Sequence, residues 1–190
     1  MINMAKVGIV VGSLRAGSFS RKIAHNVTNL FPADCTTEMI EVGNLPLYRE
    51  EYDDNPPAEY TAFRAKIKAC DAILFVTPEY NRSIPGVLKN ALDVASRPYG
   101  QSVWAGKPAG IISQSIGGLG GFGSNHHLRQ VLTFLDMPTL QQPEVYISNS
   151  SSLFDEKGQI TNQDTVKYLQ SFVEAFVAHI KRYELDTVPV

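Results

Sequence analysis

The fold of this chain is decided by residues 72–95, AILFVTPEYNRSIPGVLKNALDVA. The first five, Ala72 to Val76, form an uninterrupted apolar run, which predicts a strand buried on both faces. A polar loop follows, and residues 86–95 then place apolar side chains at the spacing of an amphipathic helix. Pro85 stands where this helix starts, a position that tolerates the missing N–H of proline. Because open α/β sheets bind ligands where a strand gives way to a helix, we expect a binding loop at residues 77–85.

The N-terminal part of the chain shows the same order of strand, loop and helix. Val7 to Val11 form another apolar run, and apolar residues recur at helical spacing from Arg21 to Phe31. The loop between them opens onto a helix N-terminus, where free N–H groups and the positive end of the helix dipole favour an anion. Four side chains of this loop add hydrogen-bond donors or positive charge: Ser13, Arg15, Ser18 and Ser20.

The residues of this first loop select one kind of anion. Gly12 and Gly17 have the spacing of a nucleoside-triphosphate loop, but Ser18 stands where that motif requires lysine. One arginine, Arg15, and several hydroxyl groups suit a single phosphate monoester, with no metal ion required. On these residues alone, a serine-capped helix without a ligand is an open alternative.

The composition is that of an ordinary globular protein. The chain has 190 residues, 44% hydrophobic and 19% charged, and this length predicts a single domain spanning residues 1–190. The net charge of -2 gives no electrostatic case for nucleic acid or an anionic membrane as a partner. No run approaches the ~20 apolar residues of a membrane span. The only two cysteines, Cys35 and Cys70, are far apart in the sequence and have no metal-ligand spacing. So few cysteines fit a reducing compartment, and we therefore expect a cytoplasmic protein.

The remaining segments alternate between strand and helix patterns. Further strands are predicted at residues 36–42, 109–112 and 144–147, and further helices at residues 58–70, 126–135 and 165–182. This alternation predicts an α/β three-layer sandwich, with a five-stranded parallel sheet and helices on both faces. In the strand order 2-1-3-4-5, the loops after the first and third strands meet at the topological switch point.

Several motifs resemble those of one known family. Thr77-Pro78-Glu79-Tyr80-Asn81, followed by Ser83-Ile84-Pro85-Gly86 and Leu88-Lys89-Asn90, is similar to the flavin-ring loop of the NADPH-dependent FMN reductases. The first loop is similar to the Gly-Ser-x-Arg-x-x-Ser phosphate loop of the same family. The resemblance covers most of the chain. These enzymes are flavodoxin-like, and they include quinone, azo-dye and chromate reductases.

The resemblance implies FMN as the cofactor and assigns residues of three loops to it. The phosphate end would contact Ser13, Arg15, Ser18, Phe19 and Ser20. The flavin ring would contact, mostly through backbone groups, Pro78, Glu79, Tyr80 and Asn81. The pyrimidine side of the ring would face Ser115 and Gly117. No catalytic side chain is assigned, because the flavin N5 takes the hydride from NADPH or NADH.

The resemblance also implies a two-electron, ping-pong reductase. Its acceptor would be a quinone or a similar small molecule, such as chromate, an azo compound or free flavin. The family is usually dimeric or tetrameric, so we expect a homodimer or homotetramer. Two other classes are open: an FMN electron carrier of the flavodoxin type, and a flavin-binding protein without enzymatic activity. The net charge of -2 is small for a carrier, since carriers are usually strongly acidic.

Two further motifs point to ligands less directly. Gly118, Gly120 and Gly123 fit the Gly-x-Gly-x-x-Gly pattern of dinucleotide sites, but the pattern starts well after the strand ends, and too few elements follow it. We therefore expect a loop that passes close over the flavin ring. His126 and His127 are adjacent and would point about 100° apart on a helix. This disfavours a metal site and is compatible with a subunit contact.

Overall fold

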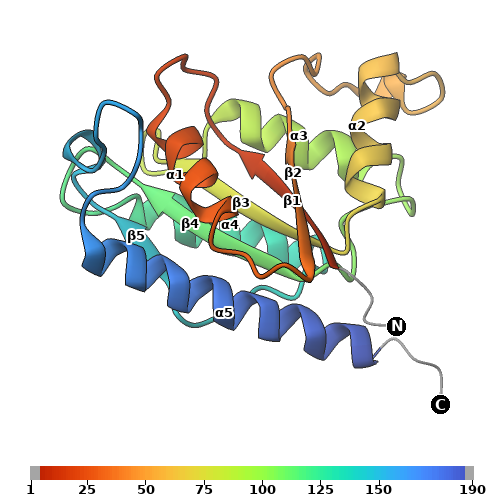
Figure 1. Ribbon diagram of the computed structural model, residues 1–190. Helices are drawn as coiled ribbons and strands as arrows, with labels where there is room; N and C mark the ends of the chain where they lie inside the picture. The colour runs from red at the N-terminus through yellow and green to blue at the C-terminus, as the bar shows by residue number, and fades with distance from the viewer. Residues whose placement is uncertain (1–4, 187–190) are drawn as a thin grey trace.

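The architecture is an open parallel sheet with helices on both faces (Figure 1). The structure, a computed structural model, describes residues 5–186. The strands are β1 Ala5–Val11, β2 Cys35–Ile40, β3 Ala72–Pro78, β4 Ala109–Gln114 and β5 Val145–Ile147. The helices are α1 Phe19–Thr28, α2 Ala58–Lys68, α3 Gly86–Ser96, α4 Phe122–Phe134 and α5 Gln163–Asp186, with short 3₁₀ helices at Glu50–Tyr52 and Ser150–Ser152. The strand order is β2-β1-β3-β4-β5 with every pair parallel, which confirms the predicted topology.

Two apolar layers form because alternate residues of each strand face opposite sides of the sheet. Val10 and Phe75 belong to the layer that includes buried residues of α2, α3 and α4. Val11 and Val76 belong to the layer that includes buried residues of α1 and α5. Figure 1 shows α5 along one face of the sheet, and α2 and α3 on the other. The central strands β1 and β3 are covered on both sides, which explains their apolar runs.

The strand register brings the carboxyl ends of four strands to one edge of the sheet. Val11 of β1 pairs with Val76 of β3. At the end of β4, Gln114 pairs with Pro78 of β3 on one side and with Ile147 of β5 on the other. The loops that follow these strands therefore start side by side, although they are far apart in the sequence.

Three helices begin earlier than the sequence pattern predicts, and one of them is α5, which begins at Gln163 rather than Thr165. Helix α1 begins at Phe19 rather than Arg21, because Ser18 caps it. Helix α4 begins at Phe122, four residues before the predicted start, after Gly121 turns the chain with a φ of 78°. Gly123 therefore lies inside α4, so the glycine pattern expected to form one loop is divided between a loop and a helix.

Trp104 is fully buried in the apolar layer that includes α2, α3 and α4. Its ring packs against Phe63 and Phe75, with centroids 6.1 and 5.8 Å away, and its Nε1 donates to the carbonyl of Leu92 at 2.9 Å. We expect Trp104→Ala to lower the free energy of unfolding by about 3–5 kcal/mol, because it leaves a cavity in the core. Urea unfolding of the cofactor-free protein, followed by circular dichroism, measures this loss. Leu47→Ala is the control, since Leu47 is 77% exposed; equal losses in the two variants would contradict the prediction.

Candidate functional site

The first loop ends at a capped helix start, with Ser18 as the N-cap of α1. The Ser18 hydroxyl accepts a hydrogen bond from the N–H of Arg21 at 3.2 Å, and the Ser18 carbonyl accepts one from the N–H of Lys22 at 3.1 Å. The N–H groups of Phe19 and Ser20 have no intrahelical partner at such a start, and they lie at the positive end of the helix dipole. The loop thus presents two backbone donors to an anion.

Arg15 supplies a positive charge beside these donors. Its guanidinium carbon lies 5.1 Å from the centre of the Phe19 ring, and its side chain is exposed. Within residues 5–186, no carboxylate lies within ion-pair distance of Arg15. Ser13 is only 6% exposed, and its hydroxyl has no hydrogen-bond partner in the part of the chain that the structure describes. An unneutralised cation and an available hydroxyl fit a phosphate monoester.

The side chains of Phe19 and Ser20 are engaged within the protein. The Phe19 ring stacks on Phe154, with centroids 6.0 Å apart and planes 3° apart. Ser20 is fully buried, and its hydroxyl accepts a hydrogen bond from Nε2 of Gln114 at 2.9 Å. For these two residues, the groups available to an anion are therefore the backbone N–H donors.

The loop after β3 is a tight turn of four residues, from Tyr80 to Ser83. The N–H of Tyr80 donates to the carbonyl of Ser83 at 2.9 Å, and the N–H of Ser83 donates to the carbonyl of Tyr80 at 3.0 Å. The two central residues, Asn81 and Arg82, have φ angles of 51° and 65°, as in a type I′ turn. Asparagine tolerates this left-handed conformation, whereas most residues adopt it at a cost of about 1–2 kcal/mol. The turn is thus held in one backbone conformation.

Glu79 braces this turn against α4. Its carboxylate accepts a hydrogen bond from the N–H of Ser124 at 3.1 Å and pairs with Nη1 of Arg82 at 3.4 Å. Gly123 makes room for it, because a Cβ there would lie 2.9 Å from Oε2 of Glu79. Negative charge is stabilised at a helix N-terminus. The carboxylate of Glu79 therefore satisfies an N–H group in the first turn of α4 and stabilises that end of the helix.

The two adjacent histidines of α4 contact different loops. Nδ1 of His127 lies 2.6 Å from the hydroxyl oxygen of Ser83, which gives the turn a second link to α4. Nε2 of His126 lies 3.0 Å from the hydroxyl oxygen of Tyr146. Within residues 5–186, no group of three or more histidine, cysteine and acidic side chains could hold a metal ion. The expected role of a histidine at a subunit contact stays a prediction.

Ser115 and Gly117 lie in the third loop, after β4. The Ser115 hydroxyl accepts from the N–H of Gly117 at 3.1 Å, and the Ser115 carbonyl accepts from the N–H of Ser150 at 3.1 Å. The Gly117 carbonyl accepts from the N–H of Asn149 at 3.3 Å. The base of this loop is therefore tied to the segment after β5, while Ile116 between them is 67% exposed.

The structure thus brings the three predicted groups of site residues to one edge of the sheet. These groups are Ser13 to Ser20, Pro78 to Asn81, and Ser115 to Gly117. Their contacts with a cofactor stay predictions. Sequence reasoning missed two residues that support them, Gln114 and His127. A polar residue at the end of an apolar strand was the available signal for Gln114, whereas no sequence pattern pairs His127 with the turn.

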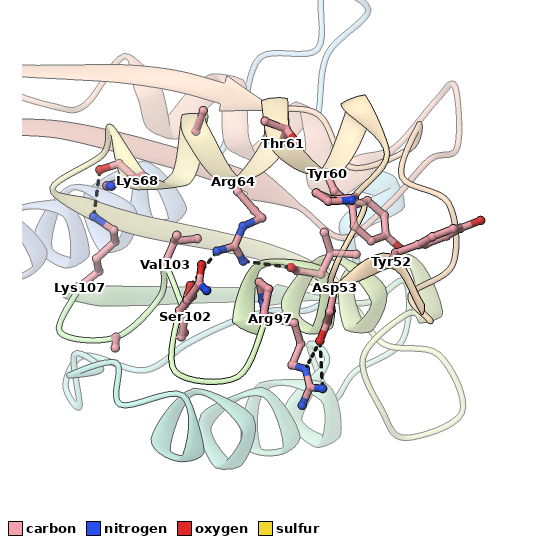
Figure 2. A pocket seen from close by; sticks show the side chains of 16 residues that line it. Tyr52, Asp53, Tyr60, Thr61, Arg64, Lys68, Arg97, Ser102, Val103 and Lys107 are labelled. Carbon is pink, nitrogen blue, oxygen red and sulfur yellow. Dashed lines mark hydrogen bonds and ion pairs between the residues drawn. The ribbon is translucent and has the colours of Figure 1, made fainter. Parts of the chain in front are cut away.

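A separate cavity of about 730 Å³ lies between α2 and residues 97–107 (Figure 2). Two positively charged side chains that line this cavity, Arg64 and Lys107, donate hydrogen bonds to backbone carbonyl groups. The Arg64 guanidinium donates to the carbonyls of Ala95 at 3.2 Å and Gln101 at 2.7 Å, and Nζ of Lys107 donates to that of Cys70 at 2.5 Å. Burial lowers the pKa of both Arg64 and Lys107. None of the predicted flavin-site residues lines this cavity, so it is distinct from the edge where the three loops meet.

These features define a flavodoxin-like protein: an open sheet in this strand order, hydrogen-bond donors for an anion after β1, and a tight turn after β3. Residues 5–152 match the model of the family described as NADPH-dependent FMN reductase, and the chain belongs to this family. It is therefore an oxidoreductase with FMN as its cofactor and a reduced nicotinamide nucleotide as its reductant.

Known relatives are similar over nearly the whole chain. A quinone reductase from Pseudomonas putida is 50% identical over 95% of this chain and 97% of its own length. A 2-hydroxy-1,4-benzoquinone reductase from Burkholderia sp is 48% identical over 93% and 96% of the two chains. The solved structure of FerB, a flavoenzyme NAD(P)H:(acceptor) oxidoreductase from Paracoccus denitrificans, has a TM-score of 0.89 at 36% identity and covers 94% of this chain and 98% of that one.

Removal of the charge and the cap from the first loop tests the phosphate site. We expect Arg15→Ala combined with Ser18→Ala to weaken FMN binding by about tenfold or more, because hydrogen bonds to charged groups contribute about 1.5–3 kcal/mol each. Titration of the cofactor-free protein, followed by flavin fluorescence, measures the affinity, and circular dichroism shows that the variant folds. The matched control is Arg182→Ala with Ser171→Ala, both exposed on α5. Unchanged FMN affinity in the first variant would remove the phosphate from this loop.

A charge in the turn after β3 tests the position of the flavin ring. Aspartate adopts the left-handed conformation of Asn81 as readily as asparagine does, so Asn81→Asp adds charge without changing the turn. We expect flavin reduction by NADPH to slow by about three- to tenfold, since a nearby like charge opposes the negative charge that the ring gains, by about 1 kcal/mol. Stopped-flow absorbance measures the rate. Asn55→Asp, at an exposed position, is the control; equal rates in both variants would place Asn81 away from the ring.

Proposed function

We propose that this chain is an NAD(P)H-dependent FMN quinone reductase, which passes two electrons from the nicotinamide to a quinone. The proposed enzyme also reduces chromate, azo compounds and free flavin, because an open flavin face can be reached by electron acceptors of many shapes. The observation that carries the proposal is that the loop of Arg15 and the turn of Asn81 start from paired strands at one edge of the sheet. Relatives named quinone reductase, which match nearly the whole chain, support the choice of acceptor.

The phosphate end of the cofactor belongs to the first loop in this proposal. Arg15 and the hydroxyl of Ser13 bind the phosphate oxygens, together with the N–H groups of Phe19 and Ser20. Ser18 acts through its cap, which holds the first turn of α1 in place. The positive end of the helix dipole adds to the charge of Arg15, so a dianionic phosphate needs no metal ion here.

The ring end belongs to the turn after β3 and to the third loop. The chemistry that FMN supplies when bound is two-electron transfer between a reduced nicotinamide and an acceptor. Pro78, Glu79, Tyr80 and Asn81 place the turn beside the ring. The hydrogen bonds between Tyr80 and Ser83 hold its shape, so Glu79 and Asn81 are the residues that offer backbone groups. Tyr80 is 52% exposed, and its ring shields one edge of the flavin from water. Ser115 and Gly117, at the third loop, bind the pyrimidine side.

Protons for the acceptor come from solvent in this mechanism. Glu79 is the only carboxylate that the sequence motif places at the ring. Its oxygens accept a hydrogen bond from the N–H of Ser124 and form an ion pair with Arg82. The protein therefore orients the reactants and excludes water, and it does not supply a dedicated acid.

The proposal includes a homodimer or homotetramer in the cytoplasm. Tyr99 and Phe134 are 90% and 89% exposed, and they line one cavity together, which supports a contact between copies of the chain. The thiol of Cys70 is buried and donates to the carbonyl of Lys66, as expected in a reducing compartment. Among the helices described within residues 5–186, none has the length and apolar character needed to span a bilayer.

An anaerobic titration of the FMN-loaded protein tests the function directly. Addition of NADPH, and separately of NADH, is expected to bleach the visible absorbance of the flavin, and addition of benzoquinone is expected to restore it. The stoichiometry should be one nicotinamide and one quinone per flavin. The more effective nucleotide identifies the preferred reductant. Heat-unfolded protein with the same amount of free FMN is the control for reduction without the binding site.

Two results would overturn this function. If neither nucleotide bleaches the flavin, but light-driven reduction stops after one electron, the protein is an electron carrier. If the protein retains no FMN at all, the two loops are structural turns, and the proposed function fails. A flavin that is bleached by a nicotinamide and restored by chromate or free flavin, but by no quinone, would keep the reductase and change its acceptor.

A further inference from the structure

Three buried polar side chains form a chain of hydrogen bonds beneath the candidate site. Nε2 of Gln114 donates to the hydroxyl of Ser20 at 2.9 Å, and the hydroxyl of Ser150 donates to Oε1 of Gln114 at 2.6 Å. Ser20 and Ser150 are fully buried, and Gln114 is 6% exposed. The glutamine amide therefore uses its donor on one side and its acceptor on the other.

The three residues belong to three different elements that meet at the same edge of the sheet. Ser20 lies in the first turn of α1, beside the backbone donors proposed for the phosphate. Gln114 ends β4, directly before Ser115. Ser150 follows β5, and its N–H donates to the carbonyl of Ser115 at 3.1 Å. Gln114 thus connects the phosphate end of the site with the loop that carries Ser115 and Gly117.

Burial makes the hydrogen bonds between Ser20, Gln114 and Ser150 a rigid link. A buried polar group that loses its hydrogen-bond partner destabilises the fold, because it has no water to replace that partner. Each of the three side chains therefore holds the others in place. Each of the three side chains thus has a hydrogen-bond partner within the group, and none is left buried without one. The pairing of Gln114 with Pro78 of β3 and Ile147 of β5 fixes the backbone from which the amide extends.

We propose that Gln114 is a positioning residue that couples the phosphate end of the FMN site to the pyrimidine end of the ring. This inference rests on the proposed function. Gln114 acts through its partners: Ser20 places the N–H donors of α1, and Ser150 places Ser115 and Gly117. A phosphate bound at the first loop thereby favours the ring-binding arrangement of the third loop. A side chain with no amide at this position removes this link, so both ends lose its support and no longer depend on one another.

The test replaces Gln114 by methionine, which has a similar length and neither donor nor acceptor. We expect Gln114→Met to weaken FMN binding by about tenfold, measured by fluorescence titration of the cofactor-free protein. The ³¹P resonance of the bound phosphate and the visible spectrum of the bound ring should both shift, because both ends lose their support. Gln130→Met is the matched control, since Gln130 is exposed on α4, and it should leave all three readouts unchanged.

A double-variant comparison separates coupling from simple destabilisation. Ser20→Ala and Ser150→Ala are made singly and together, with Gln114 present and with Gln114→Met. With Gln114 present, the loss of FMN affinity in the double variant should be smaller than the product of the two single losses, because either change already frees the amide. With Gln114→Met, the two losses should multiply independently. A purely structural role would leave the affinities multiplicative in both backgrounds.

The outcomes distinguish this proposal from the proposed function. If wild-type protein binds FMN and Gln114→Met binds it equally well, the coupling is wrong and the reductase function stands. If wild-type protein binds no FMN, both proposals fall. If Gln114→Met does not fold, Gln114→Asn takes its place: the shorter amide cannot reach both serines, and the same weakening and the same loss of coupling are expected. Equal affinity in Gln114→Asn and wild type would also overturn the proposal.

Discussion

The parallel pairing of β1 with β3 is the constraint on which the rest of this structure depends. Val11 pairs with Val76, and the N–H of Gly12 donates to the carbonyl of Val76 at 2.9 Å. A Cβ at Gly12 would lie 3.0 Å from Oγ1 of Thr77, so the first loop leaves the sheet in close contact with the second. Because the two strands are parallel and run in the same direction, the loops after them leave from the same edge of the sheet. One end of the sheet therefore collects residues that the sequence keeps far apart.

The two helix N-termini at this edge are used differently. At α4, the carboxylate of Glu79 already accepts from the N–H of Ser124, so the protein supplies its own anion. At α1, the Ser18 hydroxyl satisfies one donor, while Arg15 stands nearby without a carboxylate among the described residues. The same physical preference for negative charge thus stabilises the turn in one case and leaves room for a phosphate in the other.

Two half-buried cations, Arg64 and Lys107, follow the complementary rule. Arg64 and Lys107 donate to carbonyl groups near the C-termini of α3 and α2, where the helix dipole is negative. They line the cavity of about 730 Å³ beside α2, yet their charges are already matched by backbone carbonyl groups. Arg97 is likewise paired, with Asp53 at 3.0 Å. A cluster of positive side chains is therefore weaker evidence for an anion site than a single arginine at an open helix N-terminus.

The sequence by itself determined the strands and helices, because apolar runs and helical spacing are local properties of the chain. The strand order followed from the choice of a flavodoxin-like arrangement, and the resemblance to the FMN reductases implied the third loop of the candidate site. The sequence did not predict that α4 begins at Phe122, since the turn before it depends on Gly121 lying against the end of β4. Nor did it predict that Glu79 completes α4, that His127 contacts the turn, or that the hydroxyl of Ser20 faces Gln114. Each of these contacts joins residues distant in the sequence. Only the tertiary structure decides them, because a hydrogen bond needs a partner within about 3 Å and the sequence alone does not show which side chains come that close.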